Sequence, residues 1–154
     1  KSRWAAALMS DEKDITLHAT AIAIAGYGVI FTGESGSGKS DLALRLIDRG
    51  AILISDDRVI LEHIDDRISL RGPEKLAGKL EIRSLGIFDF GHVADVELKM
   101  EVQLGQQVER FPMDSQQNIF LGKAVPSIRL DAMESSAPIK VEMALQKLLK
   151  DMQR

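Results

Sequence analysis

The chain has 154 residues, of which 45% are hydrophobic and 28% charged, and its formal net charge is -3. This length allows one well-packed domain and leaves no room for a second, so we expect residues 1–154 to form a single domain. The near-neutral charge, without a dense run of Lys and Arg, argues against nucleic-acid binding. Cysteine is absent, which excludes disulfides, thiolate nucleophiles and Cys-ligated metals.

Residues 19–31 form the first long apolar stretch, but Thr20 and a Gly26-Tyr27-Gly28 turn interrupt it. The stretch is too short to span a bilayer, and no signal-peptide pattern precedes it. We therefore expect no membrane association and a cytoplasmic location. The turn glycines, flanked by β-type residues, instead predict a hairpin across residues 15–32.

The remaining pattern alternates between strands and helices. The periodicity predicts a helix over 40–49 that ends at Gly50, strands over 51–55, 59–63, 67–70 and 93–102, further β-structure over 80–87, and a C-terminal helix over about 138–152. The expected fold class is therefore α/β, with a mixed β-sheet and flanking helices.

A complete phosphate-binding loop follows the second strand of the predicted hairpin. Its sequence is Gly33-Glu34-Ser35-Gly36-Ser37-Gly38-Lys39-Ser40, which satisfies the P-loop spacing G-x-x-x-x-G-K-[ST]. Glycines let backbone N–H groups surround a phosphate at a helix N-terminus, Lys39 supplies a charge to the β- and γ-phosphates, and Ser40 supplies a magnesium ligand. The strand before the motif and the helix after it favour a nucleotide site over a chance glycine-rich turn.

Two adjacent carboxylates, Asp56 and Asp57, end the predicted strand over 51–55. P-loop proteins hold a magnesium-supporting carboxylate at such a strand end, and a second aspartate there could act as a general base. Which of the two accepts the proton stays open, because adjacent carboxylates share their proton affinities. A solvated turn before Arg58 is the alternative interpretation.

These residues together resemble the catalytic domain of the bacterial HPr kinase/phosphorylase family. The loop is similar to the family pattern G-[DE]-S-G-x-G-K-[ST], and His18 and Asp57 lie 15 residues before and 24 residues after Gly33. Residues 81–87, Glu-Ile-Arg-Ser-Leu-Gly-Ile, resemble the E-I-R-G-L-G-I signature, with Ser84 in place of a glycine. Glu109-Arg110 resembles an acidic-Arg pair of the family.

The resemblance implies a core like that of phosphoenolpyruvate carboxykinase and an ATP- and Mg²⁺-dependent protein-serine kinase that acts on the phosphocarrier protein HPr. Some members use pyrophosphate, and the same site carries out phosphorolysis of phosphoseryl-HPr. The implied roles are phosphate binding by Lys39, magnesium binding by Ser40 and Glu81, proton transfer by Asp57 with help from Asp56 and His18, charge stabilisation by Arg110, and site construction by Arg83. The family is typically hexameric, which implies an oligomer.

The sequence departs from the family in two places. Longer members carry an extra N-terminal domain with no equivalent in this sequence, which resembles the short form found in some Gram-negative bacteria. The glycine-containing V-x-P-G-R-N segment, tied to phosphorolysis, is replaced near residues 125–131, where Arg129 is a partial substitute. The resemblance therefore leaves the strength of the reverse reaction open.

Two other classes of function remain as alternatives. One is a small-molecule P-loop kinase, and the other is a regulatory module that binds nucleotide without transferring phosphate. For a protein substrate, we expect docking near residues 85–90 and the C-terminal helix, because Phe88 and Phe90 alternate on one side of a strand.

Overall fold

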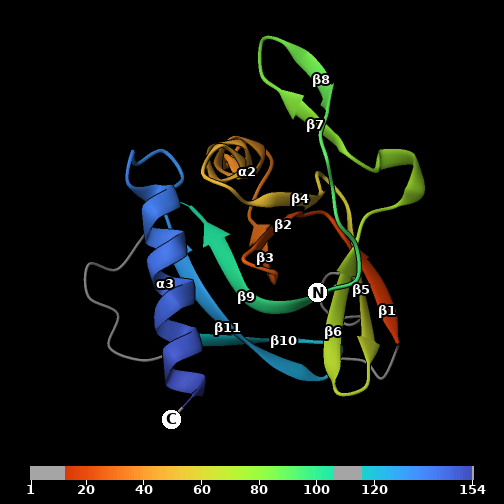
Figure 1. Cartoon of the computed structure of the whole chain (residues 1–154), viewed down its shortest axis with the longest axis vertical. Helices are drawn as coiled ribbons and strands as arrows, with labels where there is room; N and C mark the ends of the chain where they lie inside the picture. The colour runs from red at the N-terminus through yellow and green to blue at the C-terminus, as the bar shows by residue number, and fades with distance from the viewer. Residues whose placement is uncertain (1–12, 106–115, 154) are drawn as a thin grey trace.

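The computed structural model describes residues 13–105 and 116–153, which form a mixed α/β fold (Figure 1). Two α-helices and one short 3-10 helix accompany the strands in this part of the chain. The elements are β1 (Asp14–Leu17), β2 (Thr20–Ile24), β3 (Tyr27–Thr32), α2 (Lys39–Asp48), β4 (Ile52–Ser55), β5 (Val59–Ile64), β6 (Arg67–Arg71), η1 (Glu74–Leu76), β7 (Lys79–Ile82), β8 (Gly86–Asp89), β9 (Val96–Leu104), β10 (Gln116–Phe120), β11 (Lys123–Leu130) and α3 (Ala137–Met152).

The described strands form one large curled sheet and one separate hairpin. The order in the large sheet is β1-β5-β6-β9-β3-β2-β4, and β11 extends it by pairing with both β9 and β10. The β7–β8 hairpin projects from the body of the molecule, as Figure 1 shows. The expected mixed sheet with flanking helices is confirmed.

The strand directions bring four carboxyl ends to one edge of the sheet. β3 and β11 both run parallel to β9, while β4 is antiparallel to β2, which is itself antiparallel to β3. β3, β4, β9 and β11 therefore all point the same way. In open α/β sheets, ligands bind outside such carboxyl ends.

The hairpin predicted across residues 15–32 is present only as β2–β3, because β1 is a separate strand that pairs with β5, and the turn lies one residue earlier than the glycine spacing suggested. Ala25 and Gly26 form the turn, with φ of 52° and 86°. Gly28 belongs to β3, where an added Cβ would lie 2.7 Å from the carbonyl oxygen of Glu97. Gly28 is thus required for the close approach of β3 to β9, and not for the turn.

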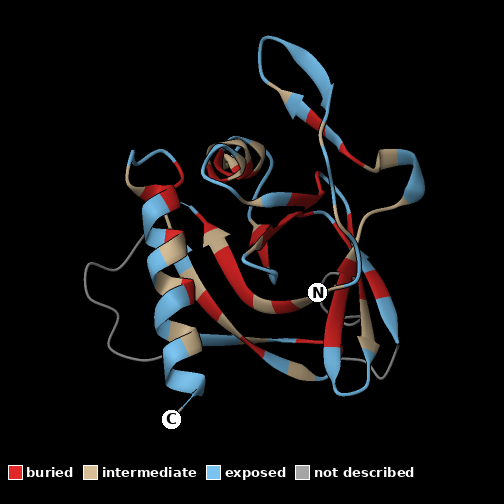
Figure 2. Ribbon diagram, in the orientation of Figure 1, coloured by how far each residue is buried: buried red, intermediate tan, exposed pale blue. Residues whose placement is uncertain are grey.

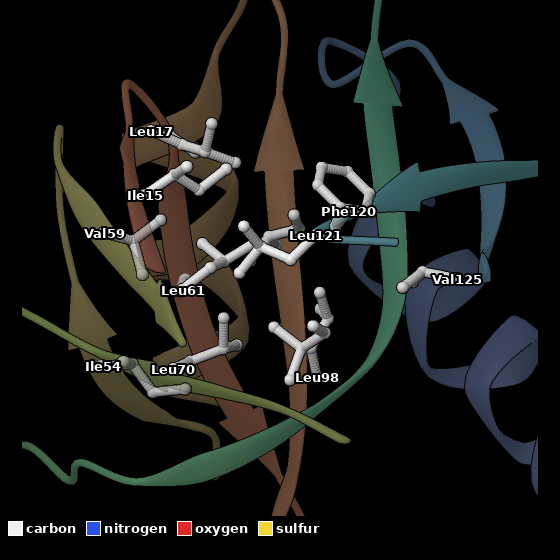
Figure 3. Close-up of a cluster of buried hydrophobic side chains, with 14 of the residues drawn as sticks. Ile15, Leu17, Ile54, Val59, Leu61, Leu70, Leu98, Phe120, Leu121 and Val125 are labelled. Atoms are coloured by element: carbon white, nitrogen blue, oxygen red, sulfur yellow. The ribbon is translucent and has the colours of Figure 1, made fainter. Parts of the chain in front are cut away.

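Buried side chains form a separate core on each face of the sheet (Figure 2). One core lies inside the curl of the strands, and Figure 3 shows its side chains converging from β1, β5, β6 and the β10–β11 turn. The other core lies beneath the helices, where Leu42 and Leu46 of α2 and Val141 and Leu145 of α3 meet the sheet. The apolar stripes predicted for both helices are therefore the buried ones.

The element boundaries agree closely with the periodicity. The two predicted helices begin one residue earlier, at Lys39 and Ala137, and Asp65-Asp66 forms the turn between β5 and β6. The strand predicted over 93–102 is displaced to 96–104. No helix in the described ranges is long and apolar enough to cross a membrane.

Candidate phosphate-transfer site

The phosphate-binding loop connects the carboxyl end of β3 to the start of α2. Gly33 and Gly38 have φ of 145° and 98°, which favour glycine. An added Cβ at Gly33 would lie 2.8 Å from both the Leu104 carbonyl oxygen and Ser37 Oγ. Inside the loop, the Ser37 amide donates to the Glu34 carbonyl at 3.0 Å. The glycines therefore allow a compact loop against β9 that ends at a helix N-terminus, the setting in which backbone amides bind phosphate.

Lys39 is a buried lysine that reaches back across the loop. Its Nζ donates to the carbonyl oxygens of Gly33 and Glu34 at 2.8 and 2.9 Å. Burial lowers the pKa of Lys39, while the charges of Asp57 and Asp56 act to raise it. The cation is thus positioned at the loop, and both predicted carboxylates are close enough to act on it.

Asp56 is buried and connects three elements. Its Oδ1 accepts hydrogen bonds from Thr20 Oγ1 of β2 at 2.9 Å and from Ser40 Oγ of α2 at 2.7 Å. The backbone N–H of Glu81 in β7 lies 3.4 Å from its Oδ2. Asp56 therefore fixes the start of α2 and the base of the β7–β8 hairpin relative to β2.

Asp57 points away from Asp56, as expected for adjacent residues at a strand end. The Arg58 amide donates to the Asp56 carbonyl at 2.8 Å across Asp57, whose φ is 69°. This arrangement is a γ-turn with a positive central φ, a rare and strained conformation. The Ala19 amide donates to the Asp57 carbonyl at 3.1 Å and helps to hold the turn.

The strained turn presents the Asp57 carboxylate to solvent beside His18. Asp57 Oδ1 lies 3.4 Å from His18 Nε2, and both side chains are more than half exposed. A carboxylate and an imidazole in contact can share and orient a proton. The structure therefore brings His18 and Asp57 into contact and places Asp57 close enough to Lys39 to act on its pKa, while the catalytic roles that the family resemblance implies for these residues stay predictions.

The oxygen donors around Ser40 suit magnesium. Ser40 Oγ donates its proton to Asp56, so its lone pairs remain free for another partner. Glu81, whose backbone N–H lies 3.4 Å from Asp56 Oδ2, has an exposed side chain. Within the described ranges no three His, Cys, Asp or Glu side chains gather as a metal-binding group. Mg²⁺ commonly uses one or two carboxylates together with substrate phosphates, so this donor set fits the ion.

Two predicted residues have no described contact with the loop, for different reasons. Arg110, with its neighbour Glu109, lies outside the described residues. Arg83 is exposed at the turn of the β7–β8 hairpin, and no hydrogen bond joins its side chain to the loop in the described part of the chain. The roles predicted for both arginines stay predictions.

A second buried carboxylate, that of Glu101 on β9, was not among the predicted site residues. Its Oε2 accepts from Thr32 Oγ1 at 2.6 Å, and its Oε1 accepts from Ser127 Oγ at 2.9 Å and from Asn118 Nδ2. The Gln103 amide lies 3.2 Å from Ser127 Oγ. Thr32 immediately precedes Gly33, so this network fixes the entry to the loop. No signal in the sequence distinguished it, because β9 alternates apolar with polar residues and Glu101 follows Glu97 and Lys99 in the polar positions.

Comparison with known proteins gives consistent matches. The family model described as the HPr serine kinase C-terminal domain matches residues 10–153. The HPr kinase/phosphorylase of Cupriavidus metallidurans is 37% identical over 145 residues, covering 86% of this chain and 45% of that protein. The HPr kinase/phosphorylase of Clostridium beijerinckii is 39% identical over 103 residues, covering 64% of this chain and 34% of that protein.

A solved structure, the Hpr(Ser) kinase/phosphatase of Coxiella burnetii, shares the fold. It superposes with a TM-score of 0.80 at 28% sequence identity and covers 90% of this chain and 93% of that one. The chain spans less than half the length of the Cupriavidus and Clostridium relatives.

Replacement of Glu101 by alanine should destabilise the protein, because the donors of Thr32, Asn118 and Ser127 would lose their buried acceptor. We expect the free energy of unfolding in urea to fall by about 2–4 kcal/mol, and by less for Glu101→Gln, which keeps one acceptor oxygen. Glu97→Ala is the control, because Glu97 lies on the same strand and is only half-buried. An equal loss in both alanine variants would contradict the assigned role of the network.

The pH dependence of ATP affinity should change when Asp57 loses its charge. Asp57 raises the pKa of Lys39, so Asp57→Asn should lower that pKa further. Lys39 loses its charge as pH rises through its pKa, so the decline of ATP affinity at alkaline pH should begin at a lower pH in Asp57→Asn than in the wild type. Calorimetric titrations of ATP across neutral and alkaline pH measure this, and superimposable profiles would contradict it.

Proposed function

Because this chain belongs to the HPr serine kinase C-terminal domain family, we propose that it transfers the γ-phosphoryl group of ATP to a seryl hydroxyl of an HPr-type phosphocarrier protein. The observation that carries the proposal is the exposed Asp57–His18 pair, close enough to the phosphate loop for Asp57 to act on the pKa of Lys39. A nucleotide-binding module needs the loop, but it needs no solvent-facing proton acceptor beside it. The pair therefore favours an enzyme.

In the proposed reaction, the acceptor hydroxyl approaches Asp57 from solvent. Its oxygen forms a bond to the γ-phosphorus, the bond from phosphorus to the β–γ bridging oxygen breaks, and ADP leaves. The hydroxyl proton passes to Asp57, whose carboxylate His18 orients. Asp56, already occupied by Thr20 and Ser40, is the structural member of the pair.

The negative charge of the transferring phosphoryl group would be balanced by residues of the loop and by residues outside it. Lys39 and the loop amides bind the β- and γ-phosphates, and Arg110 adds positive charge during transfer. Ser40 and Glu81 would hold Mg²⁺, with Asp56 orienting Ser40, and the ion would neutralise phosphate charge. We extend the proposal to pyrophosphate as an alternative donor and to phosphorolysis, in which Asp57 returns the proton.

The setting of this reaction also follows from the proposal. ATP and a phosphocarrier substrate imply a cytoplasmic enzyme without nucleic-acid or membrane partners. We propose a homo-oligomer, with a hexamer as the state that the family resemblance implies. The proposed catalytic unit is a single domain over residues 1–154.

Transfer of labelled γ-phosphate from MgATP to purified HPr tests the function. We expect serine labelling by the wild type and a loss of at least about a hundredfold in two variants: in Asp57→Asn, because general-base catalysis typically contributes this much, and in Lys39→Ala, because the phosphates would lose their positive partner. Asp65→Asn is the control, because Asp65 is also exposed and has a positive φ of 50° in a turn. ATP binding without labelling in the wild type would favour the regulatory module, and transfer to a small molecule alone would favour the other kinase class.

Docking of the protein substrate should involve the projecting β7–β8 hairpin. Leu85, Ile87 and Phe88 there are 70%, 67% and 46% exposed, whereas Phe90 is half-buried. Phe88→Glu should raise the KM for HPr severalfold with little change in the KM for ATP, because a charge would disrupt an apolar contact. Ile64→Glu on β5 is the control in steady-state kinetics. An unchanged KM for HPr in Phe88→Glu would exclude this surface.

A further inference from the structure

The segment between β11 and α3 lies against the start of α2. This segment, residues 131–136, is called the 131–136 loop below, and Figure 1 shows it beside α2. Arg45 of α2 donates to the carbonyl oxygens of Ala132 and Glu134 at 2.5 and 3.2 Å. An added Cβ at Gly38 would lie 2.9 Å from Ala132 Cβ. The 131–136 loop is thus fixed at the edge of the phosphate loop.

Met133 is the exposed apolar side chain of the 131–136 loop. It is 68% exposed, yet its Cε lies only 3.9 Å from the position of a Cβ added to Gly38. Its amide donates to Asp131 Oδ1 at 2.9 Å, which fixes the backbone at this point. A flexible, polarizable thioether is therefore held beside the glycine that precedes Lys39.

The order of the strands gives the direction of a bound nucleotide. The predicted reacting end lies toward β4, where Ser40 meets Asp56 and where Asp57 faces solvent. β9 and β11 lie on the other side of β3, and the 131–136 loop follows β11. A triphosphate that extends along the loop with its γ-phosphate toward β4 would direct its nucleoside end toward the β11 side.

From this arrangement we propose that the 131–136 loop is the nucleoside subsite, with Met133 contacting the face of the purine base. The inference rests on the proposed nucleotide-dependent function and adds the residue that would distinguish a nucleotide from an inorganic phosphate donor. Methionine makes favourable sulfur–aromatic contacts and adapts to irregular surfaces. Arg45 is the positioning residue, because it holds the carbonyls on both sides of Met133.

The test compares MgATP with magnesium tripolyphosphate, which has the same phosphate chain without a nucleoside. In Met133→Ala we expect ATP affinity to fall about three- to tenfold and tripolyphosphate affinity to stay unchanged, with Kd values from calorimetry. Met133→Leu, which keeps the apolar volume, should retain most of the ATP affinity. Met152→Ala is the matched control, because Met152 is 58% exposed and is the last residue of α3, whereas the 131–136 loop precedes the first.

The outcomes distinguish a failure of this inference from a failure of the proposed function. Unchanged ATP affinity in Met133→Ala, or equal losses for ATP and tripolyphosphate, would overturn the nucleoside subsite and leave the kinase proposal intact. A wild-type chain that binds neither compound would overturn both. Arg45→Ala supplies an independent check, because a selective loss of ATP affinity in this variant as well would support the positioning role.

Discussion

The buried carboxylate of Asp56 is the interaction on which the site depends. A buried charge is costly unless it is hydrogen-bonded, and Asp56 meets this requirement with a hydroxyl from β2, a hydroxyl from α2 and a more distant amide from β7. Three elements far apart in the sequence are thereby located against one another. Because Asp56 points inward, the next residue is directed outward, and Asp57 becomes available for chemistry.

The outward direction of Asp57 is maintained by a strained backbone. A positive φ at a non-glycine residue is unfavourable and persists only where its surroundings enforce it. Here the enforcing contacts are the hydrogen bond across the γ-turn and the one from the Ala19 amide. His18 directly precedes Ala19, so the contact that holds the turn also brings the imidazole to the carboxylate. Backbone geometry and the acid–base pair are therefore coupled through neighbouring residues.

The local parts of the site could be predicted from the sequence, because the residues of each part are consecutive in the chain. The phosphate loop, the helix after it and the Asp56-Asp57 strand end are of this kind, and the structure confirms their positions. The Glu101 network could not be predicted, because its donors come from β3, β10 and β11 and meet only through the parallel pairing of β9 with both β3 and β11. The position of Met133 close to Gly38 has the same long-range origin. The turn of the β2–β3 hairpin was displaced because one of its two glycines serves strand packing.

The two buried carboxylates hold opposite ends of the phosphate loop. Thr32, immediately before the loop, donates to Glu101, and Ser40, at the end of the P-loop motif, donates to Asp56. A loop fixed in this way is preorganised for phosphate, so less conformational freedom is lost on binding. The same carboxylates place negative charge near an anion site, and Lys39 opposes them with a pKa that burial already lowers. Because Ser40 donates its proton to Asp56, its oxygen lone pairs remain free for another partner, so the hydrogen bond that stiffens the loop is also compatible with the proposed role of Ser40 as a magnesium ligand.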